Sequence, residues 1–394
     1  LLIAIWFKFV PLIIVSTFLG LLFIIINAWK KASLFCVEPN LNLSKNRLFP
    51  DEKFQIYMSI HNDKWLPLVW IEWNFTHYDG IYFGKENECT ATIRFLWLLW
   101  YKKIKWTLSC KALHRGVYNL GQIELCSGDG FRFAETKKIF NLNKRLYIYP
   151  RLLPVRVKNF RTSIEIGSDG KQGGFIEDPL LIMGLRDYQS GDEMRRINWK
   201  ATSRTGKLQV NTYQPIVMEQ LNICIDVEGF EIDEHRYEEL NKQKVYVKMK
   251  NDMFERSLSI IASIALEYKK KGIGVGFITN GLNHEGKNLC WKPPSTNLIS
   301  VLDNLAEIDN KTLGKNMNIL DEISHRGYNH SPLYIFCERI TNTHYNWYQH
   351  NRDKFPLISF YYLIESEYGQ KLTSAKSMNT FVSMDSPRRC SNHA

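Results

Sequence analysis

The chain has 394 residues, which exceeds the length of one ordinary domain and favours two folded domains. Its residues are 45% hydrophobic and 13% aromatic, enough to form packed cores. Its formal net charge of +11 favours an anionic neighbour such as phospholipid headgroups, nucleic acid or an acidic protein. The eight cysteines include no Cys-x-x-Cys pair and no histidines at zinc-ligand spacing, which argues against a metal cluster. We expect reduced thiols, with a Cys89–Cys110 bridge across neighbouring strands as the alternative.

An uncharged apolar run covers Val10 to Trp29, about the ~20 residues that cross a hydrocarbon core. Lys30 and Lys31 follow it, so the positive-inside tendency places this end, and the domains after it, in the cytoplasm. A secretory signal peptide is the alternative, but it would be shorter and would end in small residues at a cleavage site. We predict a cell-membrane protein with a transmembrane anchor over residues 1–31, in which the apolar run before Pro11 is the remnant of a helical hairpin.

Short runs of β-branched and aromatic residues, separated by turn residues, fill residues 37–151. From Phe54 to Ile60 apolar side chains alternate with polar ones, which predicts a half-buried strand. Further strands at similar spacing predict an immunoglobulin-like β-sandwich, and they cover residues 66–75, 89–101, 103–112, 116–125 and 145–150. The apolar run Phe95 to Trp100 is predicted to be a buried strand, with contact to lipid headgroups beside the anchor as the alternative.

Residues 152–215 are predicted to be a linker, in which residues 185–210 concentrate arginine and lysine around Asp187, Asp192 and Trp199. Guanidinium groups make bidentate contacts with carboxylate or phosphate, so this cluster is a candidate site for an anionic partner. In the alternative, the acidic residues of the segment neutralise it, and the resulting ion-pair network fixes the linker against the following sheet while Trp199 packs beneath. Both hypotheses stay open.

Strands and helices alternate after Pro215. The predicted strands cover residues 221–227, 272–280, 332–338 and 356–363, and the predicted helices cover residues 253–272, 297–306, 314–325 and 345–353. This alternation predicts a doubly wound parallel sheet over residues 216–372, in which ligands bind beyond the carboxyl ends of the strands. The polar residues 373–394 are predicted to be a disordered tail.

The arginine-rich segment closely resembles the signature of the bacterial family called domain of unknown function 58. The matching positions are Arg186, Tyr188, Gly191, Asp192, Arg195, Ile197, Trp199, Lys200 and Arg204. The likeness extends to the anchor and to residues 114–121, 127–131, 148–155 and 177–179. This resemblance implies a membrane-tethered protein with a von Willebrand factor type A-like C-terminal domain, encoded beside a MoxR-type AAA ATPase and other type A-domain proteins, without an assigned activity.

A type A domain often binds Mg²⁺ through an Asp-x-Ser-x-Ser loop at the end of its first strand, because a hard cation needs closely placed oxygen ligands. In this chain the corresponding residues run from Asp226 through Glu228 to Phe230, so the aspartate matches and an apolar ring replaces a hydroxyl. We therefore predict a degraded metal site and no cofactor, with Asp226 and Glu228 as residual candidate ligands.

The sequence contains no P-loop, no nucleophile elbow and no paired-carboxylate arrangement, so we predict no catalytic residue and no enzyme activity. The first hypothesis is a scaffold or adaptor that presents its C-terminal domain to an AAA ATPase, to other type A-domain proteins or to a client protein. The alternative is a metal-assisted enzyme or binder of phosphate-bearing substrates that uses the basic cluster with Asp226 and Glu228. Specific nucleic-acid binding is not expected, because no recognised motif supports it.

Overall fold

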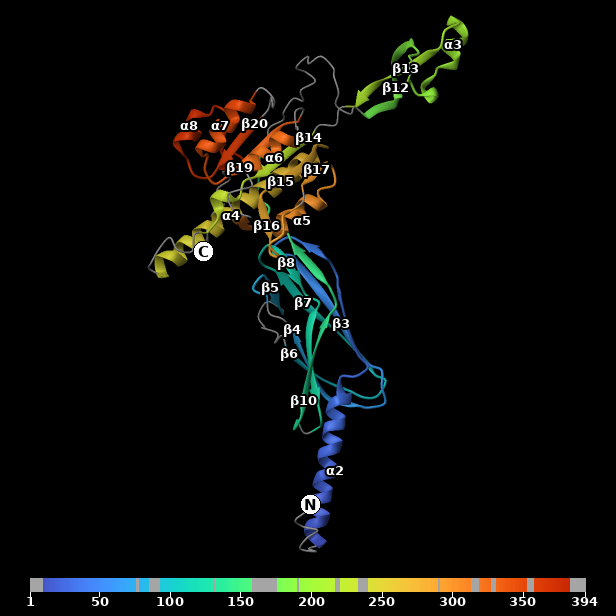
Figure 1. The fold of residues 1–394 in the computed structure, drawn as a ribbon, viewed down its shortest axis with the longest axis vertical. Coiled ribbons are helices and arrows are strands. Elements are labelled where there is room, and N and C mark those ends of the chain that lie inside the picture. The colour runs from blue at the N-terminus through green and yellow to red at the C-terminus, as the bar shows by residue number, and fades with distance from the viewer. Residues whose placement is uncertain are drawn as a thin grey trace, which may run out of the picture. The chain divides into compact units, whose positions relative to one another are not determined.

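The computed structural model describes residues 10–75, 78–84, 93–130, 132–157, 176–189, 191–216, 220–232, 240–289, 291–312, 319–326, 331–352 and 358–382. The chain divides into two compact units (Figure 1). Unit 1 comprises Leu1–Leu152 and Leu302–Ile308, and unit 2 comprises Leu153–Val301 and Asp309–Ala394. The predicted apolar segment before Val10 and the predicted Cys89 partner of Cys110 lie outside the described residues.

Unit 1 begins with α2 (Val10–Ser33), a helix of 24 residues. Its segment Ile13–Ser33 is long and apolar enough to cross a membrane, by length and composition. The described parts of the chain do not cover this segment, and side chains such as Phe23 and Ile24 are each 68% exposed. A helix that is apolar on all sides needs an apolar environment, so the helix fits the expected anchor.

Two four-stranded antiparallel sheets follow and share one hydrophobic core. The first has the order β1 (Val37–Leu43), β3 (Lys53–Asn62), β7 (Lys103–Ala112), β5 (Ile81–Phe83). The second has the order β10 (Glu135–Asn141), β9 (Gln122–Gly128), β4 (Leu68–Phe75), β6 (Ile93–Leu98). The alternation predicted around Ile56 is confirmed, because β3 buries every second side chain. Trp73 of β4 meets Trp106 of β7 edge to face, with ring centroids 5.0 Å apart, and so joins the two sheets.

The apolar run around β6 has two different faces. Leu96 and Leu98 are buried in the core, as predicted for a buried strand. Trp97, on the other face, is 73% exposed, and Trp100, beyond the end of β6, is 55% exposed, so the prediction is wrong for these two residues. Successive side chains of a strand point to opposite faces of the sheet. Where all of them are apolar, the sequence does not indicate which face is buried and which is exposed.

A small third sheet joins β2 (Arg47–Leu48), β11 (Arg145–Ile148) and β8 (Gly116–Asn119). The prediction of one strand over residues 116–125 is wrong, since β8 and β9 belong to different sheets. The chain turns between them at Gly121, where a Cβ atom would lie 2.6 Å from the amide nitrogen of Asn143. Only glycine permits this close backbone approach.

Residues 176–216 form a folded hairpin, which we call the signature hairpin. Its strands β12 (Ile176–Asp187) and β13 (Gln209–Ile216) pair antiparallel, with irregular register near Ile182. The connection between them contains η2 (Met194–Arg196) and α3 (Trp199–Thr205). This part of the predicted linker is therefore folded, because backbone pairing and the buried side chains of Ile197 and Val210 give the segment its own structure.

Unit 2 contains a six-stranded sheet. Its order is β17 (Lys292–Ser295), β15 (Gly274–Thr279), β14 (Gln220–Ile225), β19 (Leu333–Cys337), β20 (Ile358–Tyr362), β21 (Ala375–Ser377). All neighbours pair in parallel except β15 with β17, as the alternation of strands and helices predicted. Two short strands, β16 (Gly281–Asn283) and β18 (Ile308–Thr312), pair separately.

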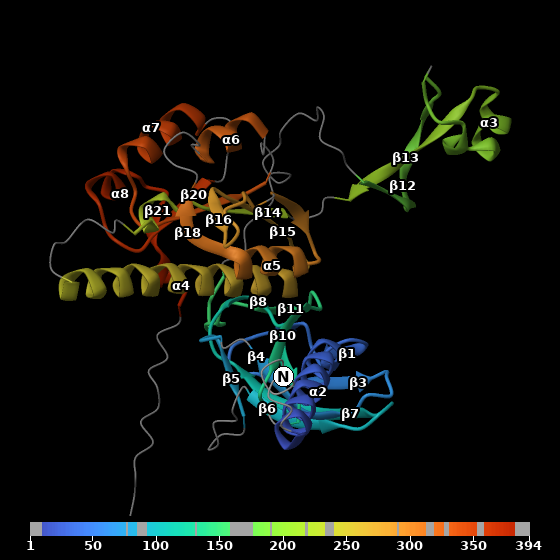
Figure 2. The ribbon, with the colours of Figure 1, turned by 60° about the horizontal axis from the view of Figure 1, so that its bottom comes forward.

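Helices cover both faces of this sheet (Figure 2). The long helix α4 (Leu240–Lys270) runs along one face and begins well before the predicted residue 253. On the other face, α6 (Ile319–Arg326) and α7 (Asn342–Asn351) enclose a core with the strands. The remaining helical segments are η3 (Glu228–Phe230), α5 (Ile299–Glu307), α8 (Glu367–Lys371) and η4 (Met378–Thr380).

The prediction of a disordered tail from residue 373 is wrong as far as Val382. Strand β21 pairs in parallel with β20, and Met378 and Phe381 are buried. The ring of Phe381 lies 4.6 Å from the ring of Tyr361, measured between centroids. These two apolar side chains pack the segment against the sheet. The prediction of disorder relied on the polar composition of the whole segment and gave these two residues too little weight. The predicted tail beyond Val382 lies outside the described residues.

Candidate functional sites

The Gly-Asp pair of the signature makes a turn that builds an ion pair. Gly191 has a φ of 109°, a conformation that favours glycine. The amide of Gln189 donates to Asp192 Oδ2 at 2.9 Å, which turns this carboxylate toward Arg186. Arg186 donates from Nη1 to Oδ2 at 2.8 Å and from Nη2 to Oδ1 at 2.6 Å. Arg186, aided by the Gln189 amide, holds the pKa of Asp192 below its ordinary value.

Two further acidic residues of the hairpin, Glu193 and Asp187, also have donors inside it. Arg195 Nε donates to Glu193 Oε2 at 2.6 Å, and Arg196 Nε lies 3.5 Å from the same oxygen. The Arg195 guanidinium lowers the pKa of Glu193. Asp187 accepts a hydrogen bond from the side chain of Gln209. This internal pairing agrees with the structural ion-pair hypothesis for Arg186, Arg195 and the acidic residues.

The short helix α3 is fixed at both ends. Asn198 caps its start, where Oδ1 accepts from the Ala201 amide at 3.0 Å, and Gly206 ends it in the left-handed conformation with φ 71°. The amide of Asn198 also donates to the Gln209 carbonyl at 2.8 Å, which ties the helix to β13. The conformation of α3 is therefore set by its sequence and by the hairpin that carries it.

Trp199 is 64% exposed, so the hypothesis that it packs beneath the segment is wrong. Lys200 and Arg204 lie one helical turn apart on α3, and Lys207 follows the C-cap; all three are exposed. We call these four residues the cationic strip. The ammonium and guanidinium groups of the strip have no acidic partner among the described residues. The hairpin therefore exposes an indole on one face of α3 and unneutralised positive charge on an adjacent face.

The remaining signature positions have structural roles. Ile197 is buried and forms a β-bridge with Val210. Tyr188 is half-buried, and its amide donates to the Leu208 carbonyl at 2.9 Å. The structure thus separates the signature into residues that build the hairpin and residues that the hairpin exposes.

The second candidate site lies at the carboxyl end of β14, where Asp226 is buried. Asp226 Oδ1 accepts from Asn280 Nδ2 at 2.7 Å and from the Glu228 amide at 3.1 Å, and Oδ2 lies 3.1 Å from His344 Nε2. The Thr341 amide donates to His344 Nδ1, which orients the ring so that Nε2 lies on the side of Asp226. Burial opposes ionisation of Asp226, but the contacts from His344 and Asn280 outweigh it, so its pKa lies below the ordinary value.

A buried ion pair stands next to Asp226 in the same unit. Lys250 Nζ donates to Glu338 Oε1 at 2.5 Å and to the Gly229 carbonyl at 2.6 Å. The two side chains are 8% and 4% exposed. Phe230 is fully buried, with its ring centroid 5.5 Å from that of Phe254, so an apolar side chain occupies this part of the loop.

Of the two candidate metal ligands, Asp226 is engaged by protein donors and Glu228 is exposed. The sequence analysis missed Asn280, Glu338, His344 and Lys250. Asn280 and Glu338 are the last residues of two predicted strands. Parallel strands bring their carboxyl ends to one edge of a sheet, so the sequence did contain evidence that these two residues lie near Asp226. His344 and Lys250 lie on helices, where nothing in the local sequence indicates a contact with the strand ends. Metal-assisted chemistry at Asp226 stays the alternative hypothesis, and the degraded metal site stays a prediction.

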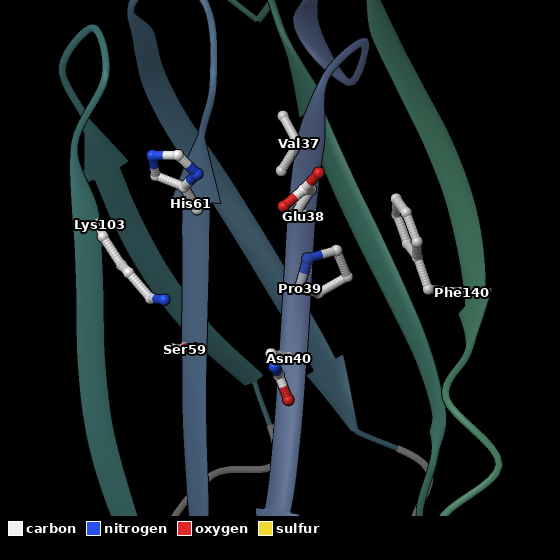
Figure 3. Close-up of a pocket in the computed structure, with 8 residues that line it drawn as sticks. All are labelled: Val37, Glu38, Pro39, Asn40, Ser59, His61, Lys103 and Phe140. Atoms are coloured by element: carbon white, nitrogen blue, oxygen red, sulfur yellow. The ribbon is translucent and has the colours of Figure 1, made fainter.

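A shallow groove of about 380 Å³ lies on unit 1, between the edge strands of its two large sheets (Figure 3). Lys103, His61 and Glu38 come from the adjacent strands β7, β3 and β1, and Phe140 of β10 forms the opposite wall. The other lining residues are Val37, Pro39, Asn40 and Ser59. The groove combines one acidic, one basic and several apolar side chains and does not point to one ligand class.

Comparison with known proteins matches residues 184–326 to the family described as "Protein of unknown function DUF58". This range begins in the signature hairpin and ends with α6. The uncharacterized protein YeaD of Bacillus subtilis (strain 168) is 20% identical over 245 residues, which cover 62% of this chain and 56% of that protein. The chain therefore matches little more than half the length of this relative.

Solved structures give only distant likenesses. The CARDB domain of the PF1109 protein from Pyrococcus furiosus has 8% identity and a TM-score of 0.20, covering 28% of this chain and 91% of that domain. Trypsin-activated alpha-2-macroglobulin from Escherichia coli has 14% identity and a TM-score of 0.20, covering 31% of this chain and 8% of that protein. At these TM-scores the likenesses carry no argument.

Proposed function

We propose that this chain, a member of the DUF58 family, is a membrane-anchored adaptor that binds a protein partner through its signature hairpin. The observation that carries the proposal is the cationic strip, in which one short, capped helix exposes Trp199 together with Lys200 and Arg204. Tryptophan and arginine dominate the energetics of protein interfaces when a partner covers them. Arg186 and Arg195 pair with Asp192 and Glu193, so these two carboxylates are engaged outside the strip and its charge remains available to an acidic partner surface.

The partner that the signature resemblance suggests is a MoxR-type AAA ATPase, acting with other type A-domain proteins. In this proposal, unit 1 holds the chain at the membrane and unit 2 is von Willebrand factor type A-like, in keeping with its mainly parallel sheet. The two antiparallel sheets of unit 1 are proposed to be an immunoglobulin-like spacer. Lys30 and Lys31 at the end of α2, and the free thiols of Cys36, Cys110, Cys126, Cys224 and Cys337, support a cytoplasmic location for both units.

Affinity capture of the full chain from its own membranes in mild detergent tests this proposal. We expect the wild-type chain to recover an AAA ATPase and Trp199→Ala to lose it. Tyr57→Ala is the matched control, because Tyr57 is also an exposed aromatic residue, at 46%, but lies in the middle of β3 in unit 1. Unchanged circular dichroism and thermal melting of Trp199→Ala would show that the loss reflects binding. Recovery of no ATPase by the wild-type chain, or equal recovery by Trp199→Ala, would count against the adaptor role.

The charge of the strip is tested separately from the indole. Replacing Lys200, Arg204 and Lys207 together by glutamine should weaken capture, and raised salt should weaken capture by the wild-type chain in the same way. The control removes equal charge from exposed lysines of α4 by replacing Lys244, Lys248 and Lys269 with glutamine. A control variant that weakens capture as much as the strip variant would show that total charge, and not the strip, attracts the partner.

A further inference from the structure

Four connections of unit 1 meet at the end of the two large sheets where α2 stops. Strand register places them there, because Val37 pairs with Asn62, Leu68 pairs with Leu98, and Ile71 pairs with Ser127. The described residues of these connections are 34–36, 63–67, 99–102, 129–130 and 132–134. All four therefore lie at the anchor end of the sheets (Figure 1).

Hydrogen bonds fix these connections to the end of α2. The ammonium of Lys64 donates to the carbonyls of Ser33 and Phe35, at the C-terminal end of the helix. Thr136 Oγ1 of β10 donates to the Lys30 carbonyl at 3.2 Å. The sheets are thus held directly at the level where the apolar part of the helix ends. Any bilayer that contains α2 must have its surface beside these connections.

Large aromatic side chains are exposed on this end. They are Phe35 at 69%, Trp65 at 75%, Trp97 at 73%, Trp100 at 55%, Tyr101 at 61% and Phe133 at 74% exposed. Soluble surfaces rarely gather so many apolar groups in one place. Tryptophan and tyrosine are enriched at membrane interfaces, where an apolar ring and a polar edge each find a suitable environment.

Positive charge surrounds the aromatic residues. Lys30 and Lys31 end the helix, Lys102 and Lys103 are exposed at the start of β7, and Arg132 is exposed on the β9–β10 connection. The acidic residues on the same connections are Asp63, which is exposed, and Asp129, which is buried and accepts from the Ala134 amide. Juxtamembrane lysine and arginine are attracted to anionic lipid headgroups.

We propose that this end of unit 1 is seated in the headgroup layer of the bilayer, with the exposed aromatic rings inserted among anionic lipids. The inference rests on the anchor of the proposed function and adds a second contact that fixes the orientation of the sheets on the membrane. We call this contact between the exposed aromatic residues and the lipid headgroups the headgroup seat. A single helix followed by a free linker would let the sheets rotate freely, whereas the headgroup seat holds them in one orientation on the membrane. Lys103, which lines the groove of unit 1, directly follows the connection of residues 99–102.

Photo-crosslinking of the full chain in lipid vesicles tests the seat. p-Benzoylphenylalanine replaces Trp97 or Phe133 in the seat, or, as a control, Tyr57, which is 46% exposed at the middle of β3. Each chain is first floated with vesicles that contain anionic phosphatidylglycerol and is then irradiated. We expect lipid adducts to be several-fold more abundant at positions 97 and 133 than at position 57. Vesicles of phosphatidylcholine alone should give fewer adducts at the two seat positions.

The two steps separate failure of the anchor from failure of the seat. A chain that does not float has no membrane anchor, which overturns the anchoring and the seat together. A chain that floats but gives equal adduct yields at positions 57, 97 and 133 keeps its anchor and overturns the seat. Equal yields at the seat positions in charged and uncharged vesicles would overturn the preference for anionic lipid.

Discussion

The signature hairpin and the carboxyl end of the parallel sheet both pair carboxylates with basic side chains. The ion pair of the hairpin is partly exposed to solvent, whereas the ion pair at the sheet end is buried. The side chains of Arg186 and Asp192 are 43% and 17% exposed, whereas those of Lys250 and Glu338 are 8% and 4% exposed. Ion pairs near solvent contribute little to stability, while breaking a buried pair leaves an uncompensated charge. Substitutions in the hairpin therefore report on binding, and substitutions at the sheet end report on folding.

The largest expected effect is on the buried ion pair. Lys250→Met should lower the free energy of unfolding of unit 2 by about 3–5 kcal/mol, because Glu338 would be left charged and buried. Denaturant unfolding followed by near-ultraviolet circular dichroism measures this loss. Adding Glu338→Leu to the same chain should restore most of it, since both charges are then removed. A single variant as stable as the wild type would show that the pair is not buried as described.

Asp226 should come next in size. Asp226→Ala leaves the Asn280 side chain and the Glu228 amide without their shared acceptor and removes the carboxylate 3.1 Å from His344 Nε2, which should cost about 1–3 kcal/mol. Because the pKa of Asp226 is lowered by folding, its contribution is present above the ordinary aspartate pKa and is lost as pH falls through the lowered value. Unfolding measured from neutral to acidic pH should therefore show a shallower acid loss for Asp226→Asn. Identical acid profiles would refute this linkage.

The exposed ion pair should matter less. Arg186→Met removes the bidentate partner of Asp192 and should raise amide hydrogen exchange locally, in residues 185–192, without moving the unfolding transition of unit 2. The pKa of Asp192 should then rise toward its ordinary value, which carboxyl titration by NMR can follow. A loss of global stability equal to that of Lys250→Met would erase the contrast between the two regions.

The smallest effect on stability is expected at Trp199. Trp199→Ala should change the free energy of unfolding by less than about 0.5 kcal/mol, because the indole is exposed. Comparison of melting curves with those of the wild-type chain measures this change. A large loss of stability would mean that Trp199 is covered by the chain itself and is unsuited to bind a partner.

The spacing of apolar residues in the sequence predicted the main strands and helices, because the side chains buried by a strand or a helix recur at the period of that element. The alternation of β3 and the strand–helix order of unit 2 both survive in the structure. Local composition failed where a few residues decide the outcome. Gly121 splits a predicted strand by close backbone approach, and Met378 and Phe381 order a segment whose other residues are polar.

The candidate sites were only partly predictable. The signature residues Arg186 and Asp192 were recognised as possible ion-pair partners, but sequence alone did not separate them from the exposed Trp199. That separation depends on which face of a seven-residue helix the hairpin leaves open. At the sheet end, the contact of His344 with Asp226 joins residues distant in sequence, and only the three-dimensional fold brings them together.

The claim that the signature hairpin meets a partner through Trp199 is tested most directly by photo-crosslinking in native membranes. p-Benzoylphenylalanine would replace Trp199 in one full-length chain and Val245, which is 70% exposed on α4, in another. We predict a discrete protein adduct at position 199, identified by mass spectrometry as an AAA ATPase, and no such adduct at position 245. Absence of a protein adduct at position 199, or the same adducts at both positions, would contradict the account.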